Sequence, residues 1–284
     1  MNTEIEFVPA PAGTETSASL DEAARVVTGA PSATAAGGEF AAAGIEYATA
    51  ASARRRLVWD LPLRAFHWLF AASIIASWAT ATAGFGWMRW HIRLGYWMIG
   101  LLSFRVVWGF VGPRHARFTS FLKGPGGIVR YLRVLAGRED AAPTVGHNPL
   151  GGVMVIIMLL LVSFQVSTGL FATDDIVWTG PYFPTVSSAT AHYLTHLHHL
   201  NINLIWAAIA LHIGAIVFYA AVKRQNLVPA MITGYKAAAL VPPREAIPNS
   251  ALWRALFAML LSVAIVYAVL SGAPVVSANS FNFG

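Results

Sequence analysis

The chain has 284 residues, of which 56% are hydrophobic and 11% are charged, with a formal net charge of +6. Soluble globular domains carry about a quarter charged residues, so this composition favours a protein that folds in lipid. The absence of cysteine excludes disulfides, iron–sulfur clusters, thiolate zinc sites and covalently attached c-type haem.

The first segment, residues 1–53, is rich in Ala, Gly, Ser, Thr and Pro and has no apolar periodicity. This composition predicts a mostly disordered tail, which we place in the cytoplasm. It is not expected to be a secretory signal, because no basic stretch followed by an apolar stretch opens it.

Five apolar runs follow, and each approaches the length of about 20 residues that spans a bilayer. They lie at about 63–83, 92–111, 150–172, 198–222 and 251–271. The third and fifth runs are almost purely apolar, whereas His, Arg, Trp or Asn interrupt the other three. We therefore expect an all-α integral membrane protein whose functional residues lie in the interrupted helices.

Lys and Arg gather in alternate connections, which predicts orientation because cytoplasmic loops are enriched in them. Basic residues precede the first run, join the second to the third, and join the fourth to the fifth: Arg54, Arg55, Arg56, Arg114, Arg117, Lys123, Arg130, Arg133, Arg138, Lys223, Arg224, Lys236 and Arg244. This pattern predicts a cytoplasmic N-terminus and an outer C-terminus. The net positive charge is then explained by the membrane topology and by attraction to anionic lipid headgroups, and no nucleic-acid partner is expected.

The nine histidines fall into two groups, those in the connections and those in or near the apolar runs. His115 and His147 fall in the basic connection, and His192 falls in an outer connection, so we expect these three to be solvated surface residues. The others lie in or near the apolar runs, where an ionisable side chain is costly and indicates function.

The fourth run contains two histidines that share a face. His198 and His212 are 14 residues apart, which on a helix leaves them within about 40° of each other and about 21 Å apart along the axis. His196 has a comparable angular offset but begins nearer the aqueous edge, and His199 lies off the face. Spacing favours His198 and leaves His196 and His199 as alternatives.

Each of these histidines has a candidate partner at its own depth. His67 lies near the cytoplasmic end of the first helix, and His91 lies at the outer end of the second. The predicted pairs are His67 with His212 and His91 with His198. Two bis-histidine sites at opposite membrane faces are typical of two b-type haems that carry electrons, since imidazole fills both axial positions. A His-lined metal path is the main competitor, but it would be expected to use carboxylates, and none lies within these helices.

Several arginines are candidates for binding haem propionates. Arg105 is 14 residues after His91 and returns to the same helix face near the inner site. Arg64 lies near His67, and Arg89 or Arg93 near His91, although these three are equally suited to reaching lipid headgroups.

Four stretches resemble a known family: "WDLPLRAFHWLF", "WHIRLGYWMIGLLSFRVVWGFVGPRHARF", "GHNPLGG" and "LHIGAIVFYAAVKRQNLVPAMITG". They are similar to the bacterial cytochrome b-561 superfamily, in the branch close to hydrogenase-type b cytochromes. The resemblance covers residues 57–236 and implies a four-helix di-haem core in the bacterial inner membrane. The family's axial ligands carry over to His67, His91, His198 and His212, although "LHH" replaces the family's "LHE"-like context. The tail of residues 1–53 and the region of residues 245–284, with its fifth helix and short outer end, lie outside it.

The resemblance also implies electron exchange between membrane quinone and a periplasmic redox partner, often a c-type cytochrome. This is the leading functional hypothesis, for an electron carrier rather than a stand-alone catalyst. One alternative is a haem-bearing anchor subunit of a hydrogenase-like oxidoreductase within a larger membrane complex. Another is a quinone-linked oxidoreductase acting on a small molecule. The outer loop, residues 173–197, is the expected docking surface for a partner.

Overall fold

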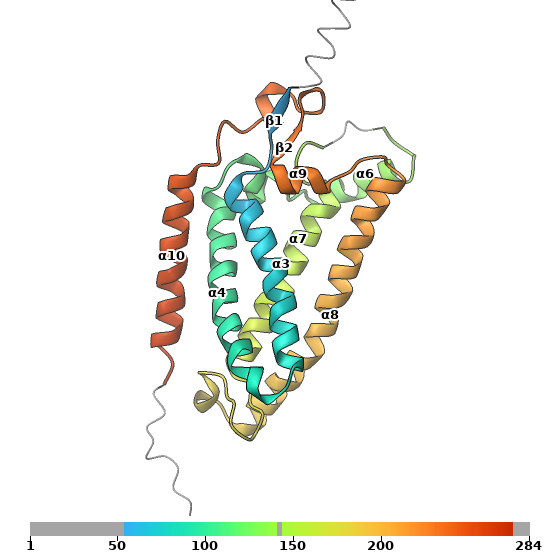
Figure 1. Ribbon diagram of the computed structural model, residues 1–284. Coiled ribbons are helices and arrows are strands. Elements are labelled where there is room, and N and C mark those ends of the chain that lie inside the picture. Colours follow the sequence, from blue (N-terminus) through green and yellow to red (C-terminus); the bar gives the residue numbers. More distant parts are fainter. Residues whose placement is uncertain (1–53, 141–143, 275–284) are drawn as a thin grey trace, which may run out of the picture. The chain divides into compact units, whose positions relative to one another are not determined.

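The computed structural model describes residues 54–140 and 144–274. Helices make up most of this part of the chain (Figure 1). Five long helices are joined by shorter elements: α3 (Leu61–Thr82), α4 (Met88–Val111), α7 (Pro149–Gly169), α8 (Ser188–Ala221) and α10 (Leu252–Ser271). The shorter elements are β1 (Arg55–Leu57), η2 (Phe85–Trp87), η3 (Arg114–Ala116), α5 (Phe118–Phe121), α6 (Pro125–Leu135), η4 (Phe183–Thr185), α9 (Val228–Thr233), β2 (Tyr235–Ala237), η5 (Ala238–Leu240) and η6 (Pro243–Glu245). The predicted tail of residues 1–53 lies outside the described residues.

The five long helices occur where the apolar runs predicted helices. Four of them are long and apolar enough to cross a membrane: η2 with α4, α7, α8 and α10. The polar residues of α3 keep it out of this group, so its span remains a prediction. Helix α8 differs most from expectation, because it begins at Ser188 rather than near residue 198. Ser187 explains the early start, since its side chain accepts a hydrogen bond from the Thr190 backbone N–H and caps the helix.

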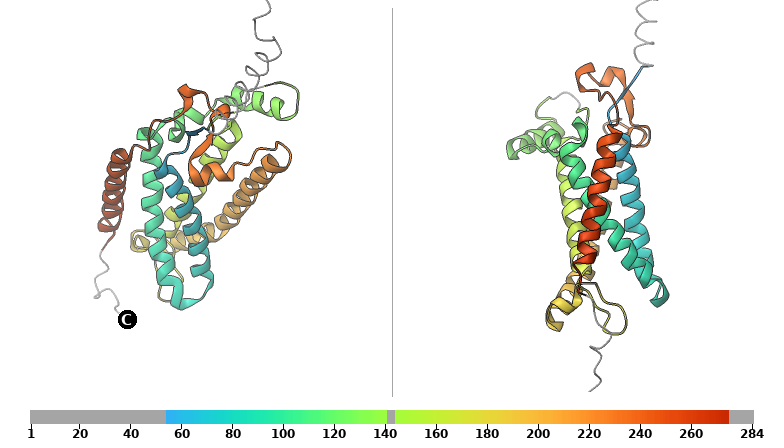
Figure 2. Two further views of the ribbon diagram at one scale, coloured as in Figure 1. Left: turned by 45° about the horizontal axis from the view of Figure 1, so that its top comes forward. Right: turned by 90° about the vertical axis from the view of Figure 1, so that its left-hand side faces the viewer.

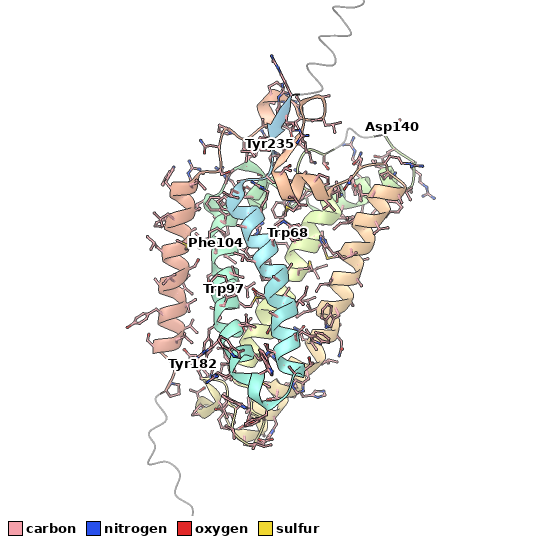
Figure 3. The ribbon with its side chains drawn as sticks, in the orientation of Figure 1. Trp68, Trp97, Phe104, Asp140, Tyr182 and Tyr235 are labelled. Carbon is pink, nitrogen blue, oxygen red and sulfur yellow. The ribbon has the colours of Figure 1, made fainter. Side chains whose placement is uncertain are left out.

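The long helices pack in sequence order. Helix α3 packs against α4, α4 against α7, and α7 against α8, while α10 lies against the outside of α4 (Figures 1 and 2). Trp97 of α4 donates a hydrogen bond from Nε1 to Ser73 Oγ of α3 at 3.0 Å, and Phe104 of α4 stacks on Trp108 (Figure 3). The core of buried apolar residues runs along these interfaces and includes Phe66, Leu101 and Trp108.

Helix α10 is held to α4 by small side chains and by contacts at its ends. Ala258 and Ser262 are its buried residues. Arg254 donates from Nη1 to the Val111 carbonyl at 3.4 Å, and the Tyr182 hydroxyl donates to the Val269 carbonyl at 2.6 Å (Figure 3). The fifth predicted helix therefore packs on the outside of the other four.

One end of the bundle carries the only sheet among the described residues, and we call it the strand end (residues 54–60, 112–140, 144–148 and 222–251). Strands β1 and β2 pair antiparallel, with Arg55 opposite Ala237 and Leu57 opposite Tyr235. Neither strand was predicted, and neither was helix α6. The opposite end, which we call the loop end, consists of residues 83–87 and 170–187.

Two histidines at the strand end are not the solvated residues that we expected. His115 is only 7% exposed, and its Nε2 bonds to the Glu245 carbonyl at 2.8 Å. The ring of His147 packs between Trp59 and Phe121, with ring centres 4.7 and 4.8 Å away. The prediction was wrong because it did not foresee that other segments cover these rings: Glu245 contacts His115, and Trp59 and Phe121 enclose His147. His192, by contrast, is exposed as expected.

Candidate functional site

The inner histidine pair joins α3 to α8, which lie far apart in the sequence. His67 comes from the second turn of α3 and His212 from α8, and their ring centres are 6.4 Å apart with an angle of 52° between the ring planes. They lie toward the strand end, because α3 begins there and α8 ends there. The structure therefore brings together the two residues that spacing paired.

The outer pair is formed by His91, in the first turn of α4, and His198 of α8. Their ring centres are 6.0 Å apart, and the ring planes are nearly perpendicular at 85°. This pair lies toward the loop end. Both of the alternatives to His198 are exposed: His196 and His199 turn outward, while His198 is partly buried.

Hydrogen bonds fix the orientation of both outer rings. His91 Nδ1 lies 2.8 Å from the Ser77 carbonyl oxygen, and His198 Nδ1 lies 2.9 Å from the Gln165 carbonyl oxygen. A carbonyl oxygen can only accept, so each Nδ1 carries the proton and donates it. The opposite nitrogen, Nε2, is then the neutral nitrogen with a lone pair for a metal ion.

Helix α7 positions His198 by two further means. Gln165 donates from Nε2 to the His198 carbonyl at 3.0 Å and accepts from Asn201 Nδ2 at 2.8 Å, which ties α7 to α8 beside the ring. Gly169 allows the ring to approach, since a Cβ there would stand 3.0 Å from His198 Cε1.

These supporting residues were not predicted. Gln165 and Asn201 do carry a signal in the sequence, because each is a polar side chain inside an apolar run. Ser77 and Gly169 carry none, because serine and glycine are common in membrane helices. The shorter contact of Ser77 with His91 is also made through its backbone carbonyl.

The surroundings of the inner pair contain buried polar atoms that lack partners among the described residues. These atoms are His67 Nδ1, Arg64 Nε, and both terminal nitrogens of Arg105. Arg105 is 2% exposed, and its guanidinium stacks over the Phe118 ring at 4.8 Å. A buried cation without a partner is strongly unfavourable, so a carboxylate-bearing group beside His67 would satisfy these atoms.

The remaining candidate arginines are placed differently. Arg64 also donates from Nη1 to the Ile232 carbonyl, which ties α3 to α9. Arg93 is exposed and lies over the Trp90 ring at 5.0 Å, and Arg89 is exposed as well. Arg105 is therefore buried within the protein and Arg64 is partly buried beside His67 on α3, whereas Arg89 and Arg93 are exposed on α4, which also carries His91.

Both pairs fit a metal ion held between two imidazoles. Metal–imidazole bonds of about 2 Å place two opposed ring centres about 6 to 7 Å apart. The observed separations of 6.4 and 6.0 Å fall at this distance. Across residues 54–140 and 144–274, no three His, Cys, Asp or Glu side chains gather into a metal-binding group, so the histidines meet in twos. A pair of histidines would suffice to hold haem iron, because the porphyrin supplies the other ligands, whereas a bare ion would require more protein ligands.

Several titratable groups at the strand end are buried or partly buried. Burial lowers the pKa of His115, and burial lowers the pKa of His147 to about 3, with the positive charge of Arg105 acting in the same direction. Burial also lowers the pKa of Lys236, whose Nζ donates to the Val145 carbonyl at 2.7 Å. His115 and His147 line a cavity of about 320 Å³ together with Arg114, Lys123 and Glu245.

Comparison with known proteins identifies the same region of the chain. A family model described as "Prokaryotic cytochrome b561" matches residues 58–234, which is more than half of the chain and contains all four paired histidines. No solved structure matches the chain.

Three relatives share the name "Probable Ni/Fe-hydrogenase B-type cytochrome subunit". The protein of Rhodobacter capsulatus is 27% identical over 226 residues, covering 65% of this chain and 84% of the relative. That of Rhizobium leguminosarum bv. viciae is 27% identical over 209 residues, covering 62% of this chain and 87% of the relative. That of Cupriavidus necator is 25% identical over 222 residues, covering 66% of this chain and 90% of the relative.

Proposed function

This chain belongs to the prokaryotic cytochrome b561 family, in the hydrogenase-type branch, and from that premise we propose that it carries electrons across a membrane through two haem groups. Membership makes it a multi-pass membrane protein that binds haem b and transfers electrons. What we propose beyond membership is the number of haems, their ligands and the partners at each membrane face.

The di-haem core would span residues 57–236 and consist of α3, α4, α7 and α8, with α3 crossing the membrane as well. Residues 1–53 would form a cytoplasmic tail, and residues 245–284 would add a fifth span and a short outer end.

The proposed ligands are His67 with His212 at the inner site and His91 with His198 at the outer site. The observation that carries this assignment is the pairing of the four rings at 6.4 and 6.0 Å, with the outer Nδ1 atoms already bonded to carbonyl oxygens. Haem b, when bound, supplies a reversible one-electron change at iron. Haem iron held by two imidazoles would serve electron transfer rather than the binding of a substrate.

The protein's own groups would set where each haem lies. Nε2 of His91 and of His198 would hold the outer iron, while Ser77 and Gln165 keep both rings in the required tautomer. At the inner site Arg105 and Arg64 would pair with propionates, which gives their unpartnered buried nitrogens a carboxylate. Arg93 would serve a propionate of the outer haem.

The proposed setting is the bacterial inner membrane, with the strand end in the cytoplasm and the loop end in the periplasm. The basic residues support this orientation, since most of those in the described chain lie at the strand end. Electrons would pass between membrane quinone and a periplasmic redox protein such as a c-type cytochrome, by way of the two histidine pairs. The described part of the outer loop, residues 173–197, would be the docking surface.

A second candidate function rests on the relatives. Their names describe B-type cytochrome subunits of Ni/Fe hydrogenases, which favours a role as the haem-bearing anchor of a hydrogenase-like oxidoreductase. The electron path through the four histidines would be the same. Only the partner at the loop end would differ.

Electron transfer by the isolated protein tests the path through the outer site. The purified chain would be placed in lipid vesicles and mixed with a short-chain quinol inside and oxidised cytochrome c outside. We expect quinol-dependent reduction of cytochrome c that is lost in His91→Ala, whereas His196→Ala, which removes an exposed histidine of the same helix, behaves as wild type. An unaltered rate in His91→Ala would contradict the outer site.

Mild detergent extraction from native membranes tests the anchor role. A stoichiometric oxidoreductase that co-purifies with the chain and reduces its haems with its own substrate would support the anchor. If the chain purifies alone and still catalyses quinol-dependent reduction of cytochrome c, the electron-carrier role is favoured instead.

A further inference from the structure

Helix α6 is an amphipathic helix that the electron path does not use. None of its eleven residues is buried, and its sequence, PGGIVRYLRVL, combines apolar side chains with two arginines. The exposed fraction of Val129 is 49% and that of Leu132 is 47%. An amphipathic helix with exposed apolar residues requires a covering environment other than water.

The position of α6 relates it to the ends of the membrane helices. Figure 2 shows α6 running across the direction of the long helices at the strand end, rather than along it. Tyr131 of α6 forms a hydroxyl hydrogen bond with Tyr219 near the end of α8, and Asn148 Nδ2 donates to the same Tyr219 hydroxyl at 2.8 Å. Asn148 is also the residue that caps the start of α7. Since α7 and α8 are both candidate spans, α6 lies at the level where they leave the bilayer.

Residues of different chemistry occupy different faces of α6. At about 100° per residue, Ile128, Tyr131 and Leu135 share the face that is partly buried against the bundle. Val129 and Leu132 lie beside that face and are exposed. Arg130 and Arg133 lie beyond them. Around the axis of α6, the face that packs on the bundle is followed by the exposed apolar residues and then by the arginines. This arrangement is typical of a helix that lies in a membrane surface.

Within the described chain, the arginines of α6 form only exposed ion pairs with one glutamate. Arg130 and Arg133 each lie near Glu139, at 3.5 and 3.4 Å, but the side chains are 71% and 60% exposed. Solvent-exposed ion pairs of this kind are weak and exchange readily. A layer of anionic headgroups can therefore compete for both arginines.

We propose that α6 lies in the headgroup layer at the strand end, with Val129 and Leu132 in the acyl boundary and Arg130 and Arg133 binding the phosphates of anionic lipids. A lipid surface satisfies both exposed features of α6, because it covers the apolar residues and neutralises the arginines. A protein partner could also cover them, and the test separates that outcome. The proposal does not depend on the haem assignment.

The absence of cysteine permits a direct test on the full chain. Single variants Val129→Cys, Leu132→Cys and Asp140→Cys would each carry a nitroxide spin label in vesicles containing phosphatidylcholine and phosphatidylglycerol. Collision with oxygen reports exposure to lipid, and collision with a water-soluble nickel chelate reports exposure to water. We expect labels 129 and 132 to favour oxygen, whereas the label at exposed Asp140 favours the chelate.

Two results at these labels would overturn the proposal. Preference for the chelate at positions 129 and 132 would place them in water. Protection from both reagents would mean that protein covers this face. Because the substituted residues are exposed, the labels are not expected to disturb the fold, and retained haem absorbance checks this.

The arginines require a separate measurement with a matched control. The double variant Arg130→Gln/Arg133→Gln would be compared with Lys223→Gln/Arg224→Gln, which removes the same charge from exposed residues after α8. Phosphatidylglycerol retained after detergent extraction from the mixed vesicles would be quantified by mass spectrometry. We expect at least a twofold loss of retained phosphatidylglycerol in the α6 variant and less in the control. Equal loss in both, or no loss in either, would overturn specific binding of anionic lipid by α6.

Discussion

Gly169 is the residue at which α7 and α8 meet beside the outer pair. A Cβ at this position would stand 3.0 Å from Cε1 and 3.3 Å from Nδ1 of His198. The same Nδ1 is bonded to the Gln165 carbonyl of α7, so moving the ring away from Gly169 would strain or break that hydrogen bond. The outer site thus depends on a residue that contributes no ligand.

Gly169→Ala should therefore displace the His198 ring and weaken the outer site. We expect a destabilisation of about 1 to 3 kcal/mol, as is usual for overpacking, and a reduced occupancy of the outer haem. Haem content and thermal unfolding of the purified protein measure both. Gly100→Ala is the matched control, because a Cβ at Gly100 would make an ordinary 3.4 Å contact with Val266. Equal behaviour of the two variants would contradict the role of Gly169.

His147 is predicted to make stability depend on pH. Burial, reinforced by Arg105, lowers its pKa from 6.5 to about 3 in the folded protein. Below pH 6.5 the unfolded chain therefore binds a proton that the folded chain does not, and stability falls as the pH drops from about 6.5 toward 3.

His147→Gln removes this proton from the unfolded state. We expect the difference in melting temperature between pH 7 and pH 5 to be smaller in this variant than in wild type, when the pH is varied in one detergent. His192→Gln, a change at an exposed histidine near the start of α8, should keep the wild-type dependence. A pH dependence unchanged by His147→Gln would show that His147 is protonated equally in both states.

The four paired histidines could be predicted from sequence because helix geometry relates spacing to direction. A separation of 14 residues fixes both face and depth on α8, and the alternation of helix direction supplies a partner for each. His115 and His147 could not be predicted, because each is covered by residues distant in the sequence: Glu245 lies 130 positions after His115, and Trp59 lies 88 positions before His147. Whether a histidine in a loop is exposed to solvent depends on residues that are distant in the sequence.

At the scale of the element, the start of α3 is the best-defined helix end of the core. Asp60 is fully buried and caps α3 by accepting from the Leu63 backbone N–H at 2.8 Å. The same oxygen accepts from Trp108 Nε1 at 2.9 Å, which joins the start of α3 to α4. One carboxylate thus fixes two helices a short distance from His67.

Asp60→Ala should destabilise the protein by about 2 kcal/mol or more, because it removes a helix cap and leaves the buried Trp108 N–H without an acceptor. Asp60→Asn keeps an oxygen for both donors and should lose less. Chemical unfolding followed by circular dichroism measures the difference. If both variants lose the same stability, the charge of Asp60, rather than its two hydrogen bonds, would be the important feature.

The long helices were predictable because each consists of an apolar run of membrane length. The short elements were not. Strands β1 and β2 contain three residues each, are 180 positions apart, and have no alternating pattern of their own. Helix α6 was not predicted because its arginines were interpreted only as part of a basic connection, and Gly126 and Gly127 near its start have low helix propensity.

At the scale of the whole molecule, orientation is the property that sequence predicts and a single structure does not test. The absence of cysteine again makes the experiment direct. Ile176→Cys, at a loop-end residue that is 81% exposed, and Asp140→Cys, at the strand end, would be expressed in bacterial cells. We expect a membrane-impermeant maleimide to label Cys at position 176 in intact spheroplasts, and at position 140 only after lysis. The reverse pattern would invert the proposed topology.

The central claim is that four histidines hold two haem b groups in one chain. The most direct measurement is the haem-to-protein ratio of the purified chain, from the pyridine haemochrome, together with the reduced-minus-oxidised spectrum. Two haems per chain are predicted. His67→Ala and His212→Ala should lose the same haem, and His91→Ala and His198→Ala should lose the other. A wild-type ratio of one haem, or paired histidines whose removal affects different haems, would contradict the account.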